Sequence, residues 1–259
     1  MNLGNVTIVL RSRRAMEVVD LSLRFLRHLA PRPYLWLALY SLVPAWLCCV
    51  LLRHVFDCSW LVVWSVAWIL SSLLELPFLS LAGLLLFDRQ ARLGRVLREA
   101  LRSLLPFAVA RTTIWLLSAL SLVIVIGPLL VAAGHCFVPE ALVLERASAW
   151  QSLGRARKFL RGRSGVGVET IVLRSFFIIA FVLLAEVVLR SVLVDGLDWA
   201  IEDEMLFEDG GSTFALLGLF AAVPYTTTFR FLAYINERTR QDGWDVQVAL
   251  MPLAQGESA

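Results

Sequence analysis

Charged side chains within otherwise apolar segments are the residues of this chain whose types could do chemistry. Glu75 lies two residues before Pro77, Glu140 directly follows a proline, and Arg230 follows a threonine-rich stretch that includes Thr227. A charged group in a lipid bilayer is costly unless it is paired or hydrated, so each is a candidate intramembrane polar site. For Glu75 two interpretations stay open: a buried partner of an arginine, or a site for a proton or cation.

The other charged residues in apolar segments have simpler expected roles. Glu186 and Arg190 are four residues apart, the spacing of a favourable ion pair on one helix. We expect Glu140 to reach the membrane interface from the end of its segment. We expect Arg111 and Arg174 to extend their long side chains toward the headgroups.

The stretch from Pro224 to Thr228 is the most polar part of its apolar segment. Its hydroxyl groups can bond to backbone carbonyls that Pro224 leaves free, or can bridge to other helices. The alternative is a hydrated groove lined by these hydroxyls, including that of Thr227, together with Glu75.

Known catalytic and metal-binding patterns are missing from the chain. There is no Walker A loop, no His-Glu-x-x-His and no Gly-x-Ser-x-Gly, and no basic surface interleaved with aromatic residues for nucleic acid. The four cysteines and three histidines lack the spacing of a metal site. We therefore predict no catalytic residue, cofactor, metal or nucleic-acid partner. A disulfide between Cys58 and Cys136 stays open as a hypothesis.

The composition assigns the chain to the membrane proteins. Of its 259 residues, 59% are hydrophobic and 17% are charged, and the mean hydropathy is +0.74. Each helical crossing of a bilayer takes about 20 apolar residues. A chain of this length that crosses several times has no room for a separate catalytic domain.

Charge decides how many crossings there are. The apolar stretch 107–144 is flanked by residues 88–105, with five arginines, and residues 145–165, with five arginines and Lys158. Both flanks belong on the cytoplasmic side by the positive-inside rule, so the stretch must cross twice and turn at Gly127-Pro128. We therefore expect six spans, at residues 34–52, 59–87, 107–126, 129–144, 168–194 and 213–235.

The remaining connections agree with this topology. Residues 195–211 hold seven acidic residues and no basic one, which places that loop outside. Arginines before residue 34 and after residue 236 place both termini in the cytoplasm. The expected organisation is an N-terminal amphipathic segment (1–33), a six-helix membrane domain (34–236) and a cytoplasmic tail (237–259).

A basic amphipathic segment precedes the first, third and fifth spans, at Ala15–Leu29, Asp88–Leu105 and Glu145–Arg161. Arginines on one face and leucines on the other are typical of helices that lie among anionic headgroups. The alternative is that these positive segments only set the topology. The predicted fold class is an all-α polytopic membrane helix bundle with six transmembrane helices and three basic interfacial helices.

Two segments bring a family resemblance. The first is Phe137–Glu145, which continues into Trp150–Arg155 and Leu160–Gly162. The second is Arg230–Tyr234 together with Glu237–Asp245. Both resemble segments of bacterial multi-pass proteins of the glycerophosphoryl diester phosphodiesterase membrane-domain-like type. The resemblance implies a membrane module of the bacterial cytoplasmic membrane without the soluble hydrolase barrel, because this chain lacks that barrel.

We expect the C-terminal tail to form a cap on the cytoplasmic side. The sixth span would continue as a helix through Arg240 and turn after Asp242. Trp244 would then fold back to the interface, while Arg238 or Arg240 meets Asp242 or Asp245.

These observations favour a non-enzymatic integral membrane protein, a scaffold or accessory subunit of a membrane complex. Its partners would be anionic headgroups at the cytoplasmic face and another membrane protein. The alternative is a small transporter or lipid-handling permease that uses the polar groups of spans two, four and six. A membrane-embedded hydrolase is a more distant possibility.

Overall fold

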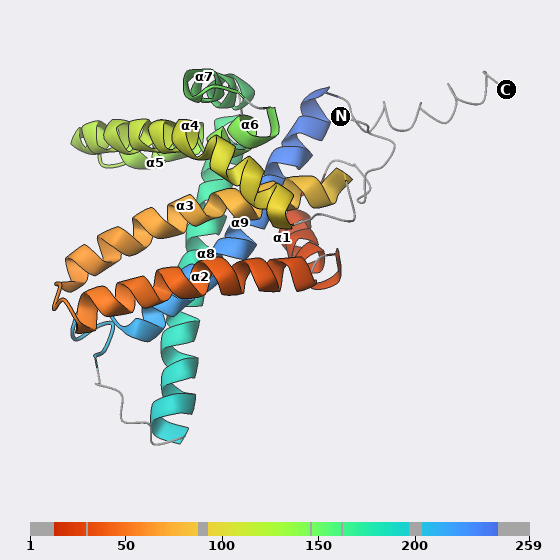
Figure 1. The fold of residues 1–259 in the computed structure, drawn as a ribbon. Coiled ribbons are helices and arrows are strands. Elements are labelled where there is room, and N and C mark those ends of the chain that lie inside the picture. The colour runs from red at the N-terminus through yellow and green to blue at the C-terminus, as the bar shows by residue number, and fades with distance from the viewer. Residues whose placement is uncertain are drawn as a thin grey trace.

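The chain folds as a bundle of helices (Figure 1). The computed structural model describes residues 13–29, 31–87, 93–145, 147–161, 163–196 and 204–242, and every regular element in these ranges is helical. The α-helices are α1 (Ala15–Arg24), α2 (Pro31–His54), α3 (Trp60–Phe87), α4 (Leu93–Leu120), α5 (Gly127–Gly134), α6 (Val138–Glu145), α7 (Ala149–Phe159), α8 (Ser164–Arg190) and α9 (Thr213–Asp242). Short π-helical turns continue α1 through Phe25–Leu29 and α8 through Ser191–Gly196, and a 3-10 turn at Ser121–Val123 follows α4.

Within the described ranges, six stretches are long and apolar enough to cross a membrane, which confirms the prediction of an all-α bundle with six such helices. They are Pro31–His54, Trp60–Leu86, Leu93–Val123, Gly127–Glu145, Gly165–Val194 and Thr213–Gln241. Each overlaps one of the six expected spans.

Helices α9 and α3 form the centre of the bundle. In the most apolar part of α9, 83% of the residues are buried, against 6% in the corresponding part of α8. Helix α9 packs against α8, α3, α1 and α2, and Figure 1 shows it crossing between the α2–α3 pair and α8. The outer half of α8 extends away from the other helices in that view. The apolar outer faces of α8, α4 and α2 are therefore turned toward the surroundings, as expected for helices in a membrane.

The central apolar stretch folds as a hairpin, with α5 packed beside α4. The chain reverses just before Gly127, which begins α5 with Pro128 in the first turn. A Cβ atom at Gly127 would lie 2.2 Å from the Ser121 carbonyl oxygen, so only glycine fits this turn. The fourth span is not one continuous helix, because turn residues separate the short helices α5 and α6.

Prolines lie inside long helices of the bundle without ending them, and one of these helices differs from the expectation. Residues 93–105 do not form a separate surface helix, since α4 runs without interruption through Pro106 into the third span. Helix α3 likewise continues through Pro77. Proline removes one backbone hydrogen bond, but neighbouring helices can hold the rest of the helix in place. Of the expected amphipathic segments, α1 and α7 are separate helices.

The ends of the bundle are held by contacts between distant parts of the chain. At one end, the backbone N–H of Arg13 donates to Asn236 Oδ1 at 2.7 Å, which fastens the start of α1 to the end of α9. At the other end, residues 204–212, called here the outer loop, cover the tips of α2 and α3. Arg53 Nε donates to Glu204 Oε1 at 2.8 Å, and Trp64 Nε1 donates to the Gly210 carbonyl at 3.0 Å.

Candidate functional site

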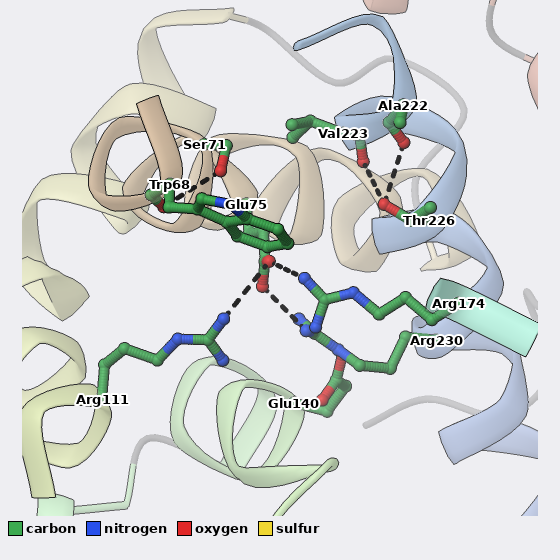
Figure 2. A network of polar contacts seen from close by, with 10 residues as sticks. All are labelled: Trp68, Ser71, Glu75, Arg111, Glu140, Arg174, Ala222, Val223, Thr226 and Arg230. Atoms are coloured by element: carbon green, nitrogen blue, oxygen red, sulfur yellow. Dashed lines mark hydrogen bonds and ion pairs between the residues drawn. The ribbon is translucent and has the colours of Figure 1, made fainter. Parts of the chain in front are cut away.

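Glu75 lies in the middle of the bundle, on α3, with 3% of its surface exposed. Three arginine side chains from three other helices surround its carboxylate (Figure 2). Arg230 Nη1 donates to Oε2 at 2.7 Å, Arg174 donates to Oε1, and Arg111 Nη2 lies 3.7 Å from Oε1. This geometry matches the interpretation of Glu75 as a buried partner of an arginine.

Glu140 is fully buried, with 0% of its surface exposed, so the expectation that it reaches the interface is wrong. Arg230 Nε donates to Glu140 Oε1 at 2.6 Å. The reason is the division of the fourth span, because α6 begins after a turn at residues 135–137 and packs against α3 and α4. Its first turn, which contains Glu140, therefore faces the core. Arg230, itself 1% exposed, joins the two acids.

Arg111 and Arg174 also differ from the expectation, because neither extends toward the headgroups. Figure 2 shows Arg111 reaching Glu75 from the side opposite Arg174 and Arg230. The Arg111 guanidinium lies 5.9 Å from the ring centroid of Trp115, close enough for a cation–π contact. Because the Glu75 carboxylate lies at the same depth, each arginine forms an ion pair with it in the core instead of extending to the headgroups.

Glu75, Glu140, Arg111, Arg174 and Arg230 are called here the core network. Three guanidinium groups and two carboxylates give a formal charge of +1 when all are ionised. One nitrogen of each arginine and one oxygen of Glu140 have no partner among the described residues. The small cavity beside Glu75 and Arg174 has room for about one water molecule.

The core network connects five helices, namely α3, α4, α6, α8 and α9. Removing one member of a buried ion pair costs about 3–5 kcal/mol, because it leaves the other charge without a partner. The arrangement can therefore fix the mutual positions of five helices, and it presents no free carboxylate at Glu75.

The threonine hydroxyls of α9 bond mainly within the helix. Thr226 Oγ1 donates to the Ala222 carbonyl at 2.9 Å, and Thr228 Oγ1 shares a hydrogen bond of 2.8 Å with the Tyr34 hydroxyl. Thr226 lines the small cavity beside Glu75. Thr227, which the alternative of a hydrated groove includes, does not line this cavity, and its hydroxyl is buried without a partner among the described residues.

Glu186 and Arg190 form the expected pair, with 3.6 Å between Oε1 and Nη1. Glu186 also accepts hydrogen bonds from the Ser212 hydroxyl and, at 3.4 Å, from the backbone N–H of Leu206. Glu186 is 12 residues beyond Arg174, which is about 18 Å along a helix. This pair therefore holds the outer loop and does not belong to the core network.

A second charged cluster surrounds Glu145 at the end of α6. Its carboxylate accepts hydrogen bonds from Arg155 Nη1 at 2.6 Å, from the Tyr234 hydroxyl at 2.6 Å, and from Arg238. Sequence reasoning missed Glu145 and Tyr234 as site residues. The available signal was the family-like pattern, because Glu145 and Tyr234 each lie in one of its two segments, and the structure brings these segments together.

The structure describes only the first part of the expected tail cap. Helix α9 continues through Arg240, as predicted, but Arg238 meets Glu145, while Arg240 lies 3.4 Å from Glu237 and donates to the Arg13 carbonyl at 3.0 Å. Trp244, Asp245 and the side chain of Asp242 lie outside the described part of the chain.

The described residues contain no group of three or more histidine, cysteine or acidic side chains that could hold a metal ion. Cys58 and Cys136 are both free, so the disulfide between them is not formed. Comparisons with protein-family models, with curated proteins and with solved structures find no match to this chain.

Proposed function

We propose that this chain is a non-enzymatic integral membrane protein that serves as a scaffold or accessory subunit of a membrane complex. The observation that carries the proposal is that the charged side chains in the middle of the bundle form ion pairs with one another. Glu75 faces three guanidinium groups and Glu140 faces one. Carboxylates held in this way support a fixed helix arrangement, whereas a transport site must exchange its partners during each cycle.

The distribution of charge supports a cytoplasmic location for the end that holds α1, α7 and the end of α9. Arginine and lysine residues are concentrated on α7 and before α1, while the outer loop is acidic. By the positive-inside rule, the basic end faces the cytoplasm and both termini lie there. The family-like segments support a membrane module of a bacterial cytoplasmic membrane.

One observation favours the alternative, a small transporter or lipid-handling permease. Polar groups from the second, fourth and sixth spans do meet, through Glu75, Glu140 and Arg230. A permease would have to open the core network to let a substrate pass. The cavity beside Glu75 would then be the closed state of that path.

Site-specific photo-crosslinking in native membranes tests the scaffold proposal. A photoreactive residue is placed at Phe176 or Leu184, which lie on the exposed face of α8, and at Leu219 of α9 as a buried control. The expected result is a crosslink from the α8 positions to one protein that also co-purifies in a fixed ratio in mild detergent. Leu219 is expected to give only products within the chain.

The proposal is wrong if the chain purifies alone, the α8 positions label only lipid, and reconstituted vesicles show solute or lipid movement that Glu75→Gln abolishes. That combination would establish the permease. Lipid analysis of the purified protein separates the two outcomes further, because a permease is expected to retain a small molecule or lipid.

A further inference from the structure

The hollow between α6, α7 and α9 lies beside the Glu145 cluster and outside the core network. Its volume is about 300 Å³, which is within the range of small-ligand sites. Ala141, Ala156 and the rings of Phe159 and Tyr234 form its apolar walls. The polar part is supplied by Arg155, Lys158, Arg238, Glu145 and Gln241.

The charge of this hollow is positive. Three basic side chains face one carboxylate, so the lining has a formal charge of +2. Glu145 is already engaged by Arg155, Tyr234 and Arg238. Lys158 has no ion-pair partner among the described residues, and Glu145 occupies only Nη1 of Arg155. Donors are therefore available for an anion, whereas the only carboxylate is not available for a cation.

The fold places the hollow where the chain leaves the membrane. Helix α6 ends the fourth apolar span at Glu145, and α7 follows directly. Helix α7 buries Ala149, Leu153 and Ala156 against its neighbours, while Trp150 is 70% exposed on the other side. Exposed tryptophans of this kind prefer the headgroup level of a membrane.

We propose that this hollow binds the phosphate group of an anionic glycerophospholipid from the cytoplasmic leaflet. Arginine and lysine are the side chains that bind phosphate oxygens most strongly. The apolar walls suit the glycerol and the first part of an acyl chain. The one carboxylate in the lining is already engaged by Arg155, Tyr234 and Arg238, which disfavours lipids whose headgroup carries a positive amine. The inference rests on the proposed function, since it names the lipid that the basic end would hold.

Lipid titration of the full-length protein in detergent micelles tests the site. The probes are dioleoylphosphatidylglycerol, dioleoylphosphatidylcholine and inorganic phosphate, and binding is followed by native mass spectrometry and by thermal stabilisation. The test variant is R155Q/K158Q. The matched control is R157Q/R161Q, which removes the same charge from exposed positions of the same segment outside the hollow. Glu145 keeps Tyr234 and Arg238 in both variants.

We expect phosphatidylglycerol to bind the unchanged protein more tightly than phosphatidylcholine, and R155Q/K158Q to weaken this binding about tenfold or more. The control is expected to change it less than threefold. Equal losses of phosphatidylglycerol binding in both variants would overturn the site, because they would show that the lipid responds to the overall surface charge and not to this hollow. Competition by millimolar inorganic phosphate would overturn the lipid as ligand. Either failure leaves the crosslinking test of the scaffold role unaffected.

Discussion

The substitution Arg230→Met tests whether the core network holds the bundle together. Arg230 is the direct partner of Glu140, whose surface is fully buried, and one of three partners of Glu75. Methionine keeps much of the apolar side chain but removes the charge. Glu140 then loses its partner, and breaking a buried pair in this way costs about 3–5 kcal/mol. By the scaling for chains of this size, that corresponds to a fall of about 6–20 °C in melting temperature.

A double-mutant cycle separates the ion pair from other effects of the substitution. Arg230→Met combined with Glu140→Leu removes both charges and leaves Glu75 with Arg111 and Arg174. Replacing a buried pair by apolar residues is often close to neutral, so the double variant is expected to regain about 2 kcal/mol relative to Arg230→Met alone.

The assay is unfolding of a fluorescent fusion in detergent, by heat and by titration with a denaturing detergent. Arg240→Met is the control, because the Arg240 side chain is partly exposed and its pair with Glu237 is expected to contribute less than about 1 kcal/mol. The reasoning is refuted if Arg230→Met is no more harmful than Arg240→Met, or if the double variant is less stable than Arg230→Met.

Two further substitutions test other contacts of the bundle. Glu186→Ala removes the acceptor that holds the outer loop, so amide hydrogen exchange in that loop should accelerate on the order of tenfold, while exchange after Glu208→Ala should stay unchanged. Gly218→Val places a Cβ about 2.5 Å from a backbone oxygen of α8, and should lower stability in detergent by about 1–3 kcal/mol. Gly154→Ala has open space and should be neutral or slightly stabilising; an equal loss at both glycines would contradict close packing of α8 on α9.

The helices and their order could be predicted because hydropathy and charge are local properties of a sequence. The two basic flanks of residues 107–144 required an even number of crossings, and the turn before Gly127 follows from that requirement. The continuity of α4 through Pro106 could not be predicted in the same way. Whether a proline ends a helix in a membrane depends on neighbours that hold the rest of it.

The candidate site could be predicted only as a set of residues. Sequence position gives the approximate depth of Arg111 and Arg174 in the bilayer, but not the direction in which each helix turns them. From the sequence alone both are therefore expected to reach the interface, whereas the structure turns both toward Glu75. The position of Glu140 could not be predicted for a related reason. The sequence does not reveal that the fourth span divides at residues 135–137, and this division decides which way Glu140 faces.

The order of the core network along the chain has a consequence for biosynthesis. Glu75 enters the membrane with the second span, whereas its partners follow on the third, fifth and sixth spans. Glu140 likewise precedes Arg230, its partner, by 90 residues. Glu75 therefore meets its first arginine as soon as the third span is inserted, whereas Glu140 has no arginine partner among the described residues until α9 arrives. A chain that stops before α9 therefore leaves Glu140 without its counter-charge, and this unpaired acid distinguishes an unfinished chain from a complete one.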